Sequence, residues 1–426
     1  MRDSGGRAWK AQAADVVRKH RPDYMIALYT GILMLIGLVV IYAIGPQRAN
    51  VLNNAIGSNF SDSYFFIKQT ISLVLAIIAF TIMAILPFKL VVKHGVKVFI
   101  AGLIACAILF IASKANLPIA EEINGASRWF NLGILGSLQP AEILKFGVLL
   151  YLAVFLGKKM KEGQVNDWKE TLIPVGVIAA ISLLFIVVIQ KDLGTGISMT
   201  AIIVTMLFIA GISKKIGIYL VSAVLIGGAF LIFTSPHRID RVVTYLQGDS
   251  SSTDDAGAYH IQHAKIAIGS GGLTGVGIGN SVQATGYLPE AINDSVFAIL
   301  GETFGFAGLV ALMAIFVALL MRMLKVLDHL VDQRLKLLVA GVFGWFGAHV
   351  ILNIAAMIGI FPLTGITLPL LSFGGTSMIF ITAALGLVFQ LSRYTVHSSR
   401  LREATNENPS SGRRVGRTRY ASRRSS

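Results

Sequence analysis

Two carboxylates stand directly before a long apolar stretch in the second half of the chain. Glu290 and Asp294 lie in YLPEAINDSVFAILG, and the apolar stretch begins at Val296. A carboxylate in this place can be a helix N-cap, which accepts hydrogen bonds from the first helical turn. It can also be a general base, which removes a proton from a reacting hydroxyl. The order Asp-Ser-Val fits an N-cap, and the residues alone leave both interpretations of Asp294 open.

Several basic residues stand in polar motifs that would suit an anionic ligand. They are Arg128, Lys145, Lys191, Arg238 and Arg241. Arg238 and Arg241 flank Asp240, so they form either a solvated charge cluster or a phosphate site, because guanidinium groups bind phosphate oxygens in pairs. Lys191 and Asp192, in QKDLGTG, fit a helix-connecting turn with its own ion pair equally well.

The other two cations also have structural interpretations. Arg128 precedes Trp129, and such a pair is common as an anchor at a membrane interface. Lys145 follows Glu142 by three residues in PAEILKFG, so both can share one helix face as an internal ion pair. A cation inside an apolar helix can equally face an anionic ligand. Both alternatives stay open for each residue.

Two further motifs resemble ligand-binding sites, but their residues favour a structural role. His260 and His263 have helical spacing, yet no Cys, Asp or Glu completes a zinc site, so we expect no metal ligands here. The run GSGGLTGVGIGNS, residues 269–281, matches neither the dinucleotide nor the P-loop motif. We therefore predict that this run serves close backbone packing.

A second small-residue motif, LSFGGTSM, contains Ser372, Gly374 and Gly375. It follows Pro362 and Pro369, which predicts a broken or re-entrant beginning of the last helix. Irregular backbone at membrane depth is tolerated where it lines a cavity or is enclosed by protein. The motif therefore favours a site that faces the outer side of the membrane.

The elements that position these residues are predicted to be membrane helices. Of the 426 residues, 54% are hydrophobic and 14% are charged, whereas soluble proteins contain about one quarter charged residues. We predict an all-α membrane protein with ten spans, since each span needs about 20 apolar residues. The spans are 24–44, 65–86, 96–113, 140–157, 171–189, 196–212, 216–233, 295–320, 337–360 and 370–391.

The distribution of charge predicts the topology. Most of the 37 Lys and Arg residues gather on one side if both termini are cytoplasmic. The chain then divides into a basic arm (1–23), a membrane domain (24–394) and a basic tail (395–426). The membrane domain carries a large extracytoplasmic loop, residues 234–294. The net charge of +15 is thus explained by topology and contact with membrane lipids, and we expect no nucleic-acid binding.

Together, these residues would form a polar site at the outer membrane surface. Cations and one or two carboxylates in a wet groove suit a lipid substrate with a phosphate-bearing head. A pyrophosphate leaving group needs positive charge rather than a strong proton donor. An acceptor hydroxyl still needs a base.

Five blocks of this sequence carry a family resemblance: NGASRWFNLGILGSLQPAEILKF, QKDLGTG, AIGSGGLTGVGIGNS, YLPEAINDSVFAILGETFGFAG and GITLPLLSFGGTS. In this order, between ten apolar stretches, the chain resembles the SEDS family of bacterial cell-wall proteins, which includes FtsW, RodA and SpoVE. The resemblance implies a peptidoglycan glycosyltransferase that polymerises lipid II at the outer face of the cytoplasmic membrane. It also implies a class B penicillin-binding protein as transpeptidase partner, with other division proteins.

The resemblance assigns Asp294 to the position of the proposed catalytic base. It implies that Asp294 deprotonates the 4-hydroxyl of the acceptor sugar, which attacks the anomeric carbon with inversion. The other positions that match family motifs are Glu290, Arg128, Lys145, Asp192, Ser372, Gly374 and Gly375. Of these, Arg128 and Lys145 would hold the pyrophosphate, with a divalent cation (Mg²⁺ or Mn²⁺) as an additional hypothesis, and Glu290 would orient the base or the acceptor.

The chain also departs from the family pattern in several places. The departing residues are Lys191, His260, His263, Ile292, Asn293, Ser295 and Thr303. The strings GNSVQ and AILGE resemble the septal branch of the family. A RodA-like polymerase of cell elongation is the alternative within it. Two other classes predict different behaviour: a lipid II flippase needs charges along a path through the membrane, and a scaffold would tolerate Asp294→Asn.

Overall fold

The computed structural model describes residues 20–123, 126–131, 133, 136–233, 239 and 256–396. Almost all of the predicted basic arm and tail lies outside these residues, as do Arg238 and Arg241. The early part of the predicted extracytoplasmic loop, before Ala256, is likewise outside them except for Ile239.

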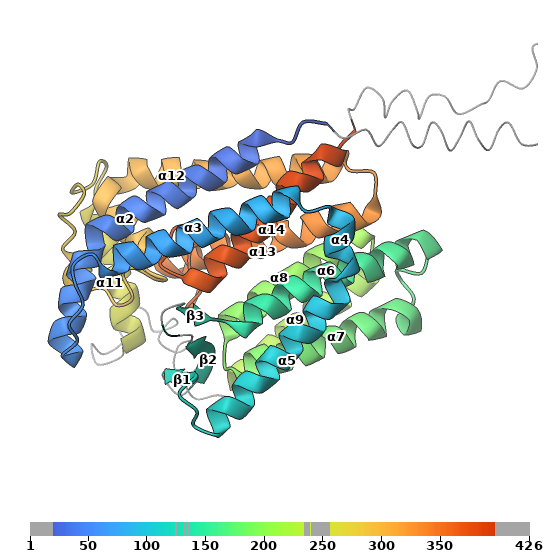
Figure 1. Cartoon of the computed structure of the whole chain (residues 1–426), viewed down its shortest axis with the longest axis horizontal. Coiled ribbons are helices and arrows are strands. Elements are labelled where there is room, and N and C mark those ends of the chain that lie inside the picture. The colour runs from blue at the N-terminus through green and yellow to red at the C-terminus, as the bar shows by residue number, and fades with distance from the viewer. Residues whose placement is uncertain are drawn as a thin grey trace, which may run out of the picture.

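Long helices packed side by side make up the protein (Figure 1). The helices are α2 (Tyr24–Ile56), α3 (Tyr64–Ile85), α4 (Phe88–Lys93), α5 (Gly95–Lys114), α6 (Pro140–Glu162), α7 (Ile173–Leu183), α8 (Leu193–Ala210), α9 (Lys214–Phe233), α11 (Ala256–Ser270), α12 (Val296–His329), α13 (Gln333–Met357) and α14 (Gly375–Leu391). Short turns of other helix types are η2 (Trp168–Leu172), η3 (Leu184–Ile189), η5 (Gln283–Thr285) and η6 (Ser392–Tyr394).

Within the described residues, nine helical stretches are long and apolar enough to cross a membrane. They coincide with nine of the ten predicted spans, and the remaining prediction, 216–233, lies inside helix α9. The protein is therefore an all-α, multi-pass membrane protein, as predicted. His20 N donates to Arg393 O at 2.9 Å, so the two ends of the described membrane domain meet, as an even number of spans requires.

Several helix boundaries differ from the prediction, and α2 ends at Ile56 rather than at 44. The last helix begins at Gly375 rather than 370, because residues 361–374 form a segment without helix, as the two prolines indicated. Helix α12 runs on to His329 but is interrupted at Gly305, whose φ of 66° and ψ of −169° are not helical. Only glycine adopts this conformation without strain.

A small sheet, which the sequence did not predict, forms in the loop between α5 and α6. Strands β1 (Ala120–Ile123), β2 (Ala126–Asn131) and β3 (Ser137–Leu138) pair antiparallel in the order β1-β2-β3. Phe130 of β2 pairs with Ala120 on one side and with Leu138 on the other. These residues form a separate small core with Leu109 of α5. The sheet therefore holds the loop, and Arg128 within it, against the end of α5.

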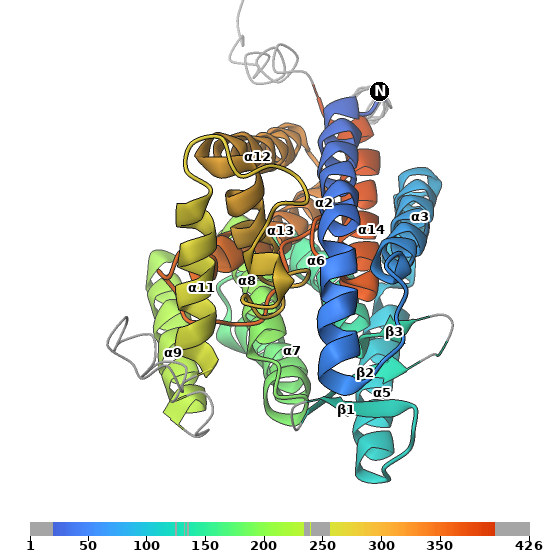
Figure 2. The ribbon, with the colours of Figure 1, turned by 90° about the vertical axis from the view of Figure 1, so that its left-hand side faces the viewer.

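The sheet and α11 lie at one end of the bundle, opposite the N-terminal end of α2 and the C-terminal end of α14 (Figure 1). Figure 2 looks onto this end, with α11 and the C-terminal part of α2 in front. In the predicted topology this is the extracytoplasmic end.

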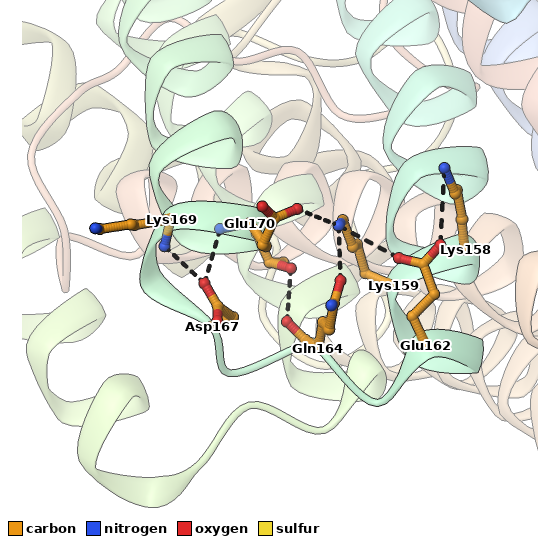
Figure 3. A network of polar contacts seen from close by, with 8 residues as sticks. Lys158, Lys159, Glu162, Gln164, Asp167, Lys169 and Glu170 are labelled. Atoms are coloured by element: carbon orange, nitrogen blue, oxygen red, sulfur yellow. Dashed lines mark hydrogen bonds and ion pairs between the residues drawn. The ribbon is translucent and has the colours of Figure 1, made fainter.

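At the opposite end, a polar network joins α6 to the start of the next span (Figure 3). Lys159 Nζ donates to Gln164 Oε1 at 2.9 Å and to Glu170 Oε2 at 2.8 Å. The Asp167 carboxylate accepts from the backbone N–H groups of Lys169 and Glu170, each at 2.8 Å. Charged side chains thus supply the hydrogen bonds that hold the connection between two apolar helices, on the side assigned to the cytoplasm.

Glycine allows α5 and α6 to touch at their backbones. A Cβ atom at Gly147 of α6 would lie 2.5 Å from Phe99 Cα, and one at Gly102 of α5 would lie 2.6 Å from Leu144 Cα. Apolar side chains gain little by association in lipid, so such close backbone packing is a main source of helix association there. The enclosed position of α6 depends on this contact.

We expect Gly147→Ala to lower the free energy of unfolding by about 1–3 kcal/mol, because the methyl group meets a neighbouring backbone. Thermal unfolding of the purified protein in detergent measures the change. Gly176→Ala in α7 is the matched control, since no atom lies within 4 Å of its Cβ position. Equal stability of both variants would contradict the proposed role of the α5–α6 contact.

Candidate active site

Asp294 lies in a compact loop immediately before α12. Ser295 Oγ donates to Pro289 O at 2.8 Å, and the N–H groups of Asn293 and Ser295 donate to Glu290 O at 2.9 and 3.3 Å. Glu290 has a φ of 49°, which turns the chain. The N-cap of α12 is Ser295 rather than Asp294. The side chain of Asp294 therefore does not have the N-cap position that its sequence context allowed.

Asn353 of α13 links the Asp294 loop to the irregular segment before α14. Its side-chain Nδ2 donates to Asp294 O and to Ile366 O, each at 2.7 Å. Both Asn353 and Asp294 are buried, at 1% and 8% exposure. Asn353 was not among the predicted site residues, although an amide within the apolar run VILNIAAM was a usable signal, since polar groups inside spans have partners.

The predicted motif around Ser372 lies beside this loop. Phe373 N donates to Ile292 O at 2.7 Å, and the Ser372 hydroxyl accepts from Leu368 N at 2.9 Å. Gly374 is extended, with a φ of 176°, and a Cβ at Gly375 would lie 3.3 Å from Ser72 Oγ. The motif thus folds residues 368–375 onto the Asp294 loop.

Asp192 caps helix α8. Its carboxylate accepts from Thr195 N at 2.9 Å, Thr195 Oγ1 at 2.7 Å and Gln139 Nε2 at 3.1 Å. Arg128 Nη2 donates to Lys191 O at 2.8 Å and Arg128 Nε to Gln190 O at 3.3 Å. Arg128 from the sheet therefore supports the turn that precedes α8, and Lys191 occupies that turn with a φ of 52°.

This turn contacts the irregular segment that Asn353 also binds. A Cβ atom at Gly194 would lie 2.8 Å from Thr364 O and 2.7 Å from Ile366 Cγ1. Residues 190–195 and the Asp294 loop therefore both adjoin residues 364–366. The fold brings together at one end of the bundle most of the residues that the sequence analysis singled out.

Lys145 lies deeper, in the interior of the bundle. Its side chain is fully buried, and Nζ is 2.8 Å from Glu142 Oε1, so the internal ion pair, one of the two alternatives for Lys145, is present. The same ammonium lies 3.4 Å from Ser198 Oγ and 4.7 Å from the centre of the Trp345 ring. A cation over an aromatic face is stabilised by the ring quadrupole. His349 is nearby and approaches Thr367 O at 3.4 Å through Nδ1.

Glu290 stands at the more exposed edge of the site. Its carboxylate forms an ion pair with Arg48 Nη2 at 3.3 Å and accepts a hydrogen bond from Asn293 Nδ2. The Glu290 side chain remains 47% exposed. Arg48 belongs to the part of α2 that extends beyond the predicted span, 24–44.

The glycine run packs against the break in α12, as predicted. Val276 N and Gly277 N donate to Glu302 O and Thr303 O at 2.9 and 3.0 Å. A Cβ atom at Gly275 would lie only 2.2 Å from Thr303 O. The run therefore pairs with backbone groups that the interrupted helix leaves without helical partners.

Glu302 holds the segment that follows the glycine run. Its buried carboxylate accepts from Ser281 Oγ at 2.5 Å and from Val282 N at 2.9 Å. Gln283 N lies 3.3 Å from both carboxylate oxygens. In the sequence, Glu302 was part of a recognised motif, but its role as an acceptor for backbone N–H groups was not predicted.

The two histidines of α11 bind the same region of the chain. His260 Nε2 lies 2.6 Å from Ser295 Oγ, and His263 Nδ1 lies 2.8 Å from Gln283 Oε1. In the part of the chain that the structure describes, no three His, Cys, Asp or Glu side chains gather in a way that could hold a metal ion.

Comparison with known proteins agrees with this architecture. The family of cell cycle proteins named for FtsW, RodA and SpoVE matches residues 23–397. The chain belongs to this family. It is 31% identical to stage V sporulation protein E of Bacillus subtilis, over 89% of this chain and 99% of that protein. It is also 31% identical to a protein of Nitrosomonas europaea named probable peptidoglycan glycosyltransferase FtsW, over 87% of this chain and 93% of the relative.

A solved structure shows that the fold of the family is present here. A chain of a peptidoglycan synthase complex, in a study on the coordination of polymerization and crosslinking, superposes with a TM-score of 0.67. The match covers 87% of this chain and 98% of that chain at 24% identity. The matched family region contains every candidate site residue, including those outside the described residues.

The buried ion pair leads to a test by paired substitutions. Lys145→Met should lower the free energy of unfolding by about 3–5 kcal/mol, because it leaves the buried Glu142 carboxylate without its counter-ion. The double variant E142Q/K145M carries neither charge and should recover most of that loss. Thermal unfolding in detergent measures both. If Lys145→Met were as stable as the wild type, the ion pair would not contribute to the fold.

Proposed function

We propose that this protein is a peptidoglycan glycosyltransferase that polymerises lipid II at the outer face of the bacterial cytoplasmic membrane. Membership of the FtsW, RodA and SpoVE family supports this activity. The position of Asp294 carries the proposal, because it is a carboxylate in a tightly held loop at the end of the bundle assigned to the outside. A reaction that needs one base and a stabilised pyrophosphate fits such a site.

In the proposed reaction, Asp294 takes the proton of the 4-hydroxyl on the acceptor sugar. The hydroxyl oxygen attacks the anomeric carbon of the donor, which is lipid II or a growing glycan strand still attached to its lipid. The new glycosidic bond forms as the bond from the anomeric carbon to the phosphate oxygen breaks, with inversion. Undecaprenyl pyrophosphate leaves with the bonding electrons, and Asp294 later releases its proton to water. Glu290 would orient Asp294 or the acceptor.

We assign the pyrophosphate to Arg128 and Lys145. Arg128 is partly exposed and bound to backbone carbonyls, so a phosphate could compete for its guanidinium N–H groups. Lys145 is enclosed and paired with Glu142, so it would reach the substrate only after this end of the bundle opens. Lys191, Asp192, Ser372, Gly374, Gly375, Arg238 and Arg241 complete the proposed substrate-binding set.

A divalent cation stays an additional hypothesis, because Mg²⁺ can be bound by one or two carboxylates together with substrate phosphates. The carboxylates of Glu142, Asp192 and Glu302 already bind other groups, so Asp294 and Glu290 are the side chains that would hold it. No step of the proposed reaction is assigned to Mg²⁺ or Mn²⁺.

We also propose a role at the division septum, with a class B penicillin-binding protein as transpeptidase partner and other division proteins nearby. The names FtsW and stage V sporulation protein E among the relatives favour this role over cell elongation. Lipid II flipping gains no comparable support.

Polymerisation of lipid II by the purified protein with its transpeptidase partner tests the proposal. Asp294→Asn keeps the size of the side chain but removes the base, so we expect glycan synthesis to fall by about a hundredfold or more. Asp328→Asn is the control, since it makes the same change at the exposed opposite end of α12. If Asp294→Asn made as much glycan strand as the control, Asp294 would not be the base, and Glu290 would be the next candidate.

A further inference from the structure

Helix α11 is held against the start of α12 along one face. His260, Ala264 and Ala267 recur at helical spacing and are buried, at 8%, 0% and 0% exposure. A Cβ atom at Gly301 of α12 would lie 3.3 Å from Ile268 Cα, so glycine allows the close approach of the two helices. His260 is the polar member of this face, nearest to the Asp294 loop.

The direction of the His260 hydrogen bond follows from the hydroxyl that it meets. A serine hydroxyl has one hydrogen to donate, and Ser295 donates it to Pro289 O at 2.8 Å. The His260 Nε2 atom, 2.6 Å from the same oxygen, must therefore be the donor. Both the neutral Nε2–H form and the imidazolium can make this bond, so it does not depend on the charge of the ring.

The same hydroxyl closes the loop that contains Asp294. Ser295 Oγ joins the two ends of residues 289–295, and Asp294 immediately precedes Ser295. Any displacement of Ser295 relative to α11 therefore moves the backbone of Asp294. A second side chain of α11, His263, also contacts this region, because its ring binds Gln283. The centre of the His263 ring lies 4.1 Å from that of Tyr259 and 6.1 Å from that of Tyr287, to which it is nearly parallel.

We propose that His260 is a positioning residue for Asp294. It donates through Nε2 to Ser295 Oγ, and this bond sets the distance of the 289–295 loop from α11. The catalytic consequence rests on the proposed function, whereas the effect on the loop does not. A misplaced base costs rate because the reacting atoms must be aligned within a fraction of an ångström.

Three variants separate the hydrogen bond from the bulk of the side chain. His260→Ala removes the donor, and His260→Gln keeps an N–H donor of similar reach. His329→Ala is the control, because His329 lies at the other end of α12 and its ring Nδ1 lies 2.8 Å from a carbonyl of its own helix, that of Lys325. All three are purified in the same detergent and compared with the wild type.

The first readout is hydrogen–deuterium exchange of the backbone amides in residues 287–296. We expect exchange to be about fivefold faster in His260→Ala, the effect of losing one hydrogen bond, and unchanged in His260→Gln and His329→Ala. The second readout is lipid II polymerisation with the transpeptidase partner. Here kcat of His260→Ala should fall about ten- to a hundredfold, with KM unchanged within about twofold and the rate restored in His260→Gln.

Unchanged exchange in His260→Ala would overturn the inference, whatever the activity. Equal impairment of His260→Gln and His260→Ala would overturn it as well, because the Nε2 donor would then not be the cause. Failure of the proposed function gives a different pattern. In that case the wild type itself makes no glycan strands, while the exchange comparison still decides whether His260 holds the loop.

Discussion

Irregular backbone inside a membrane protein needs hydrogen-bond partners from the protein, and this requirement shapes the whole end of the bundle that holds Asp294. Hydrocarbon offers no partner for a free N–H or C=O group. The Asn353 side chain donates hydrogen bonds to two such carbonyls, those of Asp294 and Ile366. The Glu302 carboxylate accepts hydrogen bonds from the N–H groups of Val282 and Gln283. These two polar side chains within the spans therefore serve the backbone of the loops.

The break in α12 follows the same rule. A helix interrupted at Gly305 leaves N–H and C=O groups without helical partners. The glycine run supplies them, since Gly272 O accepts from Phe306 N at 2.9 Å and Leu273 O accepts from Ala307 N at 3.1 Å. Bulkier residues could not approach so closely, because a Cβ atom would lie 2.0 Å from Gly301 O at Gly271 and 2.2 Å from Thr303 O at Gly275.

The carboxylates of the site divide into two kinds. Glu142, Asp192 and Glu302 each bind a cation or several N–H and O–H donors that belong to the fold, so substitution there acts first on stability. Asp294 is placed differently, in a loop whose backbone is held by α13 and whose closing hydroxyl is held by α11. A base on a rigid support loses little entropy when the substrate arrives. The family position of Asp294 and this support of its backbone are why the proposed chemistry concentrates on it.

Hydropathy and composition by themselves determined the all-α membrane fold, because spans must be long, apolar and helical. Local spacing also determined the Glu142–Lys145 ion pair, since three residues on a helix bring side chains together. The motif order was enough to recognise the family. Each of these features depends on residues that are near one another in the chain or on properties averaged over a segment.

The tertiary structure alone decided which distant residues meet. Ser295, not Asp294, is the N-cap of α12, and the departing residues His260 and Ser295 prove to be partners across 35 positions. The hydrogen bond between Asn353 and Ile366 is not predicted by any local sequence pattern. The small sheet around Arg128 arises because Phe130 finds an apolar surface on α5. Such contacts depend on how helices pack in three dimensions, which the hydrophobic pattern of any one segment does not specify.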